Sequence, residues 1–165
     1  GLPVTAGAKW DRDWRRVART EMARARNTAA LYADLRAHPV NAGWEPGQPL
    51  KVPKVLVFKI PQETRRDEKG RLLMPCQHCQ RLWRVDDTTP RLYPLEQLIA
   101  NGDNGNGGVG GGPRKAAEYL PTVGPIHPHC VCGPLLYYVP ETLHLFPKME
   151  EQVQAFAGQG FEGVA

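Results

Sequence analysis

Two short stretches, Cys76-Gln77-His78-Cys79 and His127-Pro128-His129-Cys130-Val131-Cys132, decide the fold of this 165-residue chain, because they hold all four of its cysteines. Two thiolates separated by two residues can bind one ion, and a distant pair can complete a tetrahedron around it. The N-terminal sequence shows no signal peptide, so we expect a reducing compartment, in which paired cysteines indicate a metal and not disulfides. The spacing therefore predicts a structural zinc site that joins the middle of the chain to its C-terminal third.

The second stretch offers more donors than a single ion needs. The predicted ligands are Cys76, Cys79, Cys130 and Cys132. Because residues i and i+2 of an extended segment face the same way, His127 or His129 is the alternative to one of the last two cysteines. Two disulfides or four buried thiols are the remaining interpretations. We expect His78, which lies between the first two cysteines, to face solvent or backbone.

The sequence marks no catalytic residue. Pro75-Cys76-x-x-Cys79 matches half of the zinc-deaminase signature, but that chemistry also needs an upstream ligand followed by a proton-shuttling glutamate. The only upstream histidine, His38, is followed by Pro39 and Val40. We therefore expect a protein that is not an enzyme. A small zinc-containing nuclease or toxin-like enzyme, with His127 or His129 as its base, is one alternative, and a zinc-supported DNA-binding module is another.

Outward from the cysteines, the hydrophobic pattern predicts an α+β fold. Residues 11–38 form one expected helix, which Pro39 ends. Its apolar stripe consists of Trp14, Val17, Ala18, Met22, Ala25, Ala29 and Tyr32. The β-branched run 54–60 is the clearest strand. Further strands are expected at 71–74, 91–93 and 134–139, and a short helix at 95–101. The predicted architecture is a long N-terminal helix packed on a small, mainly antiparallel sheet with a zinc-clamped loop region.

The same pattern divides the chain into three parts. Residues 1–10 are expected to be a flexible N-terminal segment, and residues 11–140 the domain itself, with the helix at 11–38 and the sheet and zinc region at 50–140. Residues 141–165 are expected to form an acidic helical tail with a frayed end. The glycine-rich tract from Asn101 to Gly112 is predicted to be mobile, because such a run loses much conformational entropy on ordering.

The charge balance is mildly basic, with 21 lysines and arginines against 17 acidic residues and a net charge of +4. Arginines crowd the faces of the expected helix beside its apolar stripe. Those singled out as partner or nucleic-acid contacts are Arg12, Arg15, Arg16 and Arg19. They form either a solvated helix face or a surface for DNA or an acidic protein. No run of 18 apolar residues is present, so we expect no membrane span.

The order of these features resembles the phage Mu F-like minor head proteins, also called the phage head morphogenesis family. The resemblance runs over roughly residues 11–140. Its pieces are Arg16-Val17-Ala18-Arg19-Thr20-Glu21, Cys76-x-x-Cys79 followed by Leu82, Pro90-Arg91-Leu92-Tyr93-Pro94-Leu95, and Pro121 to Cys132, which is similar to the closing Gly-x-x-His-Pro-x-Cys-x-Cys signature. The chain departs from the family in its longer glycine tract and in Val131, where the family often has arginine.

This resemblance implies a non-enzymatic minor capsid protein of a tailed phage or prophage. It implies a place in the capsid interior of the virion, and in the host cytoplasm during assembly. The implied partners are the portal protein, the major capsid protein and double-stranded DNA, with no membrane and no small-molecule substrate. Members of the family are often larger than this chain, so we expect it to be part of a longer protein.

Overall fold

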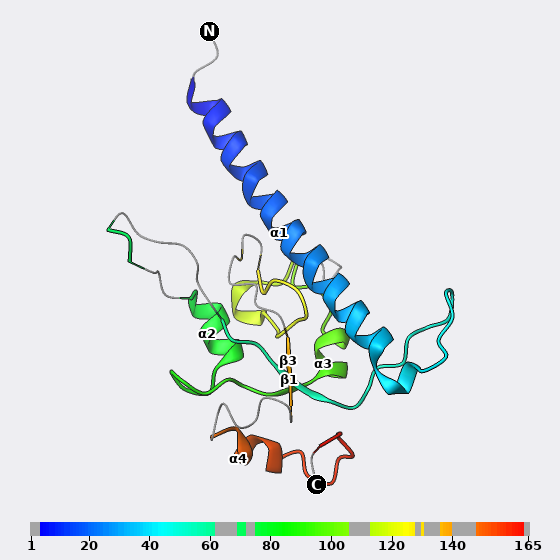
Figure 1. Cartoon of the computed structure of the whole chain (residues 1–165). Coiled ribbons are helices and arrows are strands. Elements are labelled where there is room, and N and C mark those ends of the chain that lie inside the picture. The colour runs from blue at the N-terminus through cyan, green and yellow to red at the C-terminus, as the bar shows by residue number, and fades with distance from the viewer. Residues whose placement is uncertain are drawn as a thin grey trace.

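The computed structural model describes residues 4–61, 69–71, 75–105, 113–127, 130, 136–139 and 148–163, with side chains from residue 14 onward apart from residue 16. Four α-helices and a small sheet make up the described chain, which is an α+β arrangement (Figure 1). The elements are α1 (Val4–Ala37), η1 (Pro39–Asn41), β1 (Leu56–Phe58), α2 (Gln77–Trp83), β2 (Tyr93–Pro94), α3 (Leu95–Ala100), η3 (Ala116–Glu118), β3 (Tyr137–Tyr138) and α4 (Met149–Gln154).

The sheet has three antiparallel strands in the order β2-β1-β3. Val57 of β1 pairs with Tyr93 on one side and with Tyr138 on the other, which makes β1 the central strand. The expected strand 54–60 is present over Leu56–Phe58, and the expected strand 91–93 is shifted to Tyr93–Pro94. Within the expected strand 134–139, Tyr137–Tyr138 form β3, and residues 134–135 lie outside the described residues. In the expected strand 71–74, Arg71 lies outside any strand, and residues 72–74 lie outside the described residues.

Both faces of β1 are buried, and alternate side chains enter two different clusters. Val55 and Val57 face the first cluster, with Leu35, Cys79, Trp83, Leu95, Leu98, Ile126 and Cys130. Leu56 and Phe58 face the second cluster, with Leu92, Val139, Met149, Val153 and Phe161. We call these the cysteine-side cluster and the tail-side cluster. A continuous apolar run such as Leu56-Val57-Phe58 is typical of a strand that is covered on both faces.

Helix α1 differs from its prediction in extent and in orientation. It begins at Val4 and not at residue 11, so residues 4–10 continue the helix instead of forming a flexible segment. Alanine and lysine in this stretch favour helix, and extending an existing helix is easier than starting one. The helix is about 50 Å long, and its N-terminal half extends beyond the other elements (Figure 1). No helix among the described residues is long and apolar enough to span a bilayer.

The predicted apolar stripe of α1 lies on its exposed side. Trp14 is 64% exposed, Met22 71% and Tyr32 48%. The buried positions are instead Thr20, Asn27 and Leu35, which lie on the opposite side of the helix. Polar contacts turn this side inward: the Asn27 amide donates to the Val123 carbonyl at 3.4 Å, and Arg24 pairs with Asp103 at 2.7 Å. The stripe therefore does not face the core, and the inward side of α1 is the one that carries Leu35 of the cysteine-side cluster.

The C-terminal segment also belongs to the core and is not a separate tail. Helix α4 places Met149 and Val153 against the tail-side face of β1, and Phe161 is buried beside them. The backbone N–H of Glu162 donates to the carbonyl of Lys54 at 2.7 Å. The expected fraying after residue 158 does not occur over the described residues, because an aromatic anchor and a backbone hydrogen bond hold this segment. Figure 1 shows α4 beneath the sheet.

Candidate metal centre

The first two cysteines are placed by the start of helix α2. Cys76 is the N-cap residue with extended backbone (φ −61°, ψ 151°), and its Sγ accepts a hydrogen bond from the Cys79 N–H at 3.4 Å. An N-cap side chain and the residue three positions later meet at the first helical turn. The helix therefore brings both sulfurs to one side, where the sequence predicted only a tight turn.

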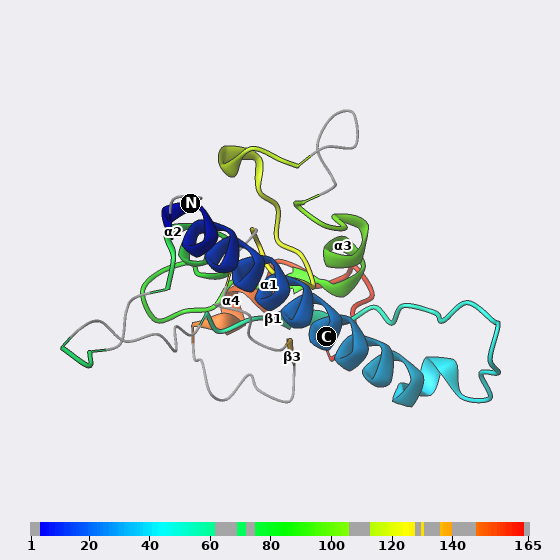
Figure 2. The same cartoon turned by 90° about the horizontal axis from the view of Figure 1, so that it is seen from above.

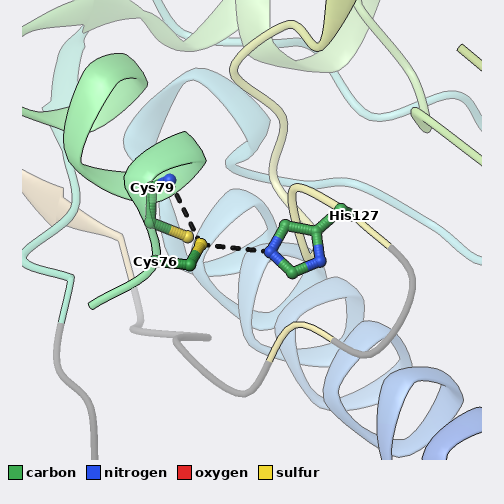
Figure 3. Close-up of side chains that lie close together, drawn as sticks. All are labelled: Cys76, Cys79 and His127. Carbon is green, nitrogen blue, oxygen red and sulfur yellow. Dashed lines mark hydrogen bonds between the residues drawn. The ribbon is translucent and has the colours of Figure 1, made fainter. Parts of the chain in front are cut away.

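His127 reaches the same point from a segment 51 residues further along the chain, its Nε2 lying 3.1 Å from the Sγ of Cys76. The Sγ atoms of Cys76 and Cys79 and one ring nitrogen of His127 all lie within 4.8 Å of one another. Figure 3 shows the histidine ring pointing at the two sulfurs from the opposite loop. These three residues lie close enough together to bind one metal ion.

Cys130 is held beside this group by a tight turn, in which its N–H donates to the carbonyl of His127 at 3.0 Å. Its Sγ lies 3.6 Å from the Sγ of Cys79, and both residues are buried. A disulfide has sulfur atoms about 2.05 Å apart, so Cys79 and Cys130 are not covalently joined. The described donors are therefore three sulfurs and one imidazole nitrogen.

The donor types fit a tetrahedral ion, and the separations of Cys76, Cys79 and His127 permit one, whereas Cys130 lies beside Cys79 but outside the group of three whose donor atoms are all within 4.8 Å of one another. Three thiolates and one imidazole are a common ligand set of structural zinc sites, with Zn–S near 2.3 Å and Zn–N near 2.0 Å. Tetrahedral bonds of these lengths place two sulfurs about 3.8 Å apart and a sulfur and a nitrogen about 3.5 Å apart. The observed separations of 3.6 Å for Cys79–Cys130 and 3.1 Å for Cys76–His127 are close to these values.

Aromatic neighbours fix the orientation of the His127 ring. Its ring stacks on Tyr119 with centroids 6.1 Å apart and meets the His78 ring edge-on at 5.5 Å. His78 and Tyr119 also contact each other edge-on at 5.2 Å. His78 was expected to face solvent or backbone, but it packs against these two rings and so helps to position His127. Its place on the first turn of α2 brings it to the loop that carries the histidine.

A buried lysine lies against the same cluster. Lys59 follows β1 and is only 2% exposed. Its Nζ donates to the carbonyls of Val123 and Gly124, and lies 5.2 Å from the centre of the Trp83 ring. Burial lowers the pKa of Lys59 to about 7, and negative charge on Cys130 and Cys79 acts in the opposite direction. Sequence analysis did not single out this residue, although a lysine inside the run Leu56-Val57-Phe58-Lys59-Ile60 was a visible signal.

The loop that carries His127 is anchored by Asn104, a fully buried residue. Its side-chain amide donates to the carbonyls of Leu120 at 2.9 Å and Ile126 at 2.7 Å, and its Oδ1 accepts from the Leu120 N–H at 3.0 Å. Residues 101–105 are thus ordered, contrary to the mobility expected of the glycine-rich tract, because one asparagine satisfies three backbone groups. Residues 106–112 lie outside the described residues.

The other predicted site residues divide into two groups. Cys132 and the alternative ligand His129 lie outside the described residues, so the structure bears on neither. Of the helix arginines, Arg15 and Arg19 are exposed on α1, whereas the side chains of Arg12 and Arg16 lie outside the described residues.

Comparisons of the chain with protein-family models, with curated proteins and with solved structures found no match.

Proposed function

We propose that this chain is a non-enzymatic minor head protein of a tailed phage or prophage, in which a structural zinc ion holds an assembly domain together. The observation that carries the proposal is the meeting of Cys76, Cys79 and His127 from two segments 51 residues apart. These are the same two segments that resemble the head morphogenesis family. The proposed role in the virion comes from the resemblance. The cluster explains why the two segments occur together, because residues from both would bind one ion.

The ligands in this proposal are Cys76, Cys79, His127 and Cys130, which we call the metal centre. Four protein donors would fill the coordination of zinc and leave no position for an activated water, which is the arrangement of structural sites. The ion would supply cross-linking energy and no reaction step. This favours a structural role over the nuclease alternative.

The exposed stripe of α1 is the proposed contact with the portal or the major capsid protein. Its members are all exposed: Trp14, Val17, Ala18, Met22, Ala25, Ala29 and Tyr32. The spacing of three and four residues is that of a helix that packs on a partner helix, and the alanines permit close approach. Large exposed apolar side chains in a contiguous row mark an interaction surface more often than a solvated one.

Particle incorporation tests the proposal. We expect the chain to co-sediment with procapsids when it is expressed together with the portal and major capsid proteins of its own phage. The double variant M22E/Y32E should lose incorporation while it retains bound metal and its melting temperature. The matched control K54E changes charge on an exposed side chain outside α1 and should incorporate as the unchanged chain does. Equal incorporation of M22E/Y32E and the unchanged chain would contradict the docking surface, and sustained DNA cleavage by the purified chain would contradict a non-enzymatic role.

Double-stranded DNA is the second proposed partner, favoured by the exposure of Arg15 and Arg19 on the same helix. Arginine contacts with phosphate release counterions, so such binding weakens steeply as salt rises. We expect the affinity for duplex DNA to fall at least about tenfold between 50 and 200 mM salt, since even two phosphate contacts lose that much. An affinity that does not change over this range would contradict a DNA contact through these arginines.

A further inference from the structure

The buried ammonium group of Lys59 has no carboxylate partner among the described residues, which makes its charged form unfavourable. Its ammonium group is buried at 2% exposure, and it contacts two carbonyl oxygens and the face of an indole ring. No carboxylate among the described residues forms an ion pair with it. A buried charge that no opposite charge balances is costly. A negative group near Lys59 would offset this cost.

Thiolates of the metal centre would supply this negative charge. Cys79 and Cys130 are buried in the cysteine-side cluster with Val57, on the side of β1 toward which Lys59 points its ammonium over the Trp83 ring, and negative charge on them would favour the charged form of Lys59. Trp83, whose ring lies under the ammonium, belongs to helix α2, as does Cys79. A divalent ion bound by three thiolates and a neutral imidazole carries one net negative charge. One lysine neutralises such a centre, whereas a four-thiolate centre would keep a negative charge.

Lys59 also holds the loop that carries the histidine ligand. Its Nζ donates to the carbonyls of Val123 and Gly124, which lie a few residues before His127. The carbonyl of Val123 accepts a second hydrogen bond from the Asn27 amide of α1. The lysine thus lies where helix α1, the histidine loop and the cysteine-side face of β1 meet.

We propose that Lys59 is the charge-balancing and positioning residue of the metal centre, matched to a centre of three thiolates and one imidazole. This inference rests on the proposed metal centre. It adds a residue that would make no bond to the ion and yet sets how tightly the ion binds. Partners of this kind around metal ligands typically change metal affinity by 10–100-fold.

Metal titration of the full chain tests the proposal. Purified metal-free chain is titrated with Co²⁺, whose thiolate charge-transfer absorption reports binding, and Zn²⁺ affinity is then measured against a competing chelator. We expect K59M to lose about 10–100-fold in Zn²⁺ affinity. K59R, which keeps the charge, should lose less. The matched control K54M removes an exposed lysine five positions earlier and should bind as the unchanged chain does.

A double variant of Lys59 and the ligand Cys130 distinguishes an effect of the Lys59 charge from an effect of its packing. In a C130H background a neutral imidazole replaces one thiolate, so a ligand is kept while one negative charge is absent, and K59M should then cost less affinity than it does in the unchanged chain. If K59M alone does not fold, K59M/C130H should be the better folded of the two variants. Equal costs of K59M in both backgrounds, or a folded K59M chain with unchanged Zn²⁺ affinity, would overturn the role of Lys59 and leave the metal centre intact. Failure of the unchanged chain to bind either metal would overturn the centre and the lysine role together.

Discussion

The two faces of strand β1 bury similar apolar side chains, yet they depend on different chemistry. The cysteine-side face, with Val55 and Val57, adjoins three sulfurs, an imidazole and a buried lysine. The tail-side face, with Leu56 and Phe58, adjoins only aliphatic and aromatic side chains in the second cluster. Figure 2, seen from above, shows helix α1 passing over the sheet while α4 lies beneath it. One strand thus joins a face beside a possible metal site to a face that packs against an apolar cluster.

Metal removal should have the largest effect, and it should act on the cysteine-side face. Bound zinc contributes roughly 10 kcal/mol or more of apparent folding free energy in small zinc peptides, because the ligands are brought together only on folding. We expect chelation, or the variant C79S, to abolish cooperative thermal melting followed by circular dichroism. A chain that melts identically with and without chelator would show that this face is stable without an ion.

The identity of the fourth ligand can be tested on the same face with a matched pair of variants. H127A should lose Zn²⁺ binding and stability almost as C79S does, because His127 lies within reach of both sulfurs. C132A should keep the metal and melt close to the unchanged chain. The reverse result, with C132A impaired and H127A intact, would restore the four-cysteine site that the spacing first predicted.

Truncation on the tail-side face should have an intermediate effect. The Phe58 side chain is fully buried, and its ring stacks on Tyr137 with centroids 5.4 Å apart. We expect F58A to lower the free energy of unfolding by about 3–5 kcal/mol, as is usual for a buried phenylalanine. Zinc content, measured on the folded fraction by elemental analysis, should not change. Loss of metal from folded F58A would show that the two faces are not independent.

A smaller effect is expected where the sheet meets helix α1. The Tyr138 hydroxyl donates to Asp34 at 3.1 Å, and burial together with this carboxylate raises the pKa of Tyr138. Y138F should cost about 1 kcal/mol in denaturant unfolding near neutral pH. Because the folded pKa lies above the unfolded one, this contribution is complete below about pH 10 and is lost as pH rises further. A difference between the two chains that grows above pH 10 would contradict this assignment.

The smallest effect is expected at Asp86, on the surface beside α4. Its carboxylate accepts from the backbone N–H groups of Thr88 and Thr89, which holds the pKa of Asp86 well below its usual range. A lowered folded pKa stabilises the fold at pH values above about 4, and this is lost as the carboxylate protonates in acid. D86N should therefore melt slightly lower than the unchanged chain at pH 6, with the gap closing toward pH 2. A gap independent of pH would exclude this cause.

Residue periodicity and cysteine spacing predicted the parts of the fold that depend on neighbouring residues or on ligand chemistry. The β-branched run 54–60 predicted the strand that became β1, and a short helix was predicted at 95–101, where α3 lies. Cysteine spacing predicted that residues near 76 and 130 meet. These features depend on neighbours in sequence or on ligand chemistry, which periodicity and spacing can report.

The remaining features depend on contacts between distant residues. The inward side of α1 is decided by Asn27, whose partner Val123 lies 96 positions away. The order of residues 101–105 rests on Asn104, which binds backbone groups of a loop 16 to 22 positions later. A sequence can show an apolar stripe without showing what covers it, and a buried asparagine or lysine follows no periodic pattern. For this reason the pattern did not indicate which side of α1 faces inward, and Lys59 was not singled out.

The 51-residue separation between Cys76 and His127 has a consequence for chain continuity. An ion bound by both segments would be a second connection between them, parallel to the peptide backbone. A protease site introduced into the glycine-rich stretch 106–112 would then permit a cut that leaves two pieces associated. Chelation would leave strand β3 and the tail-side cluster as the contacts between the pieces, and returning the metal would restore the further connection. The chain could thus serve as a two-part assembly in which one connection is reversible and set by the concentration of free zinc.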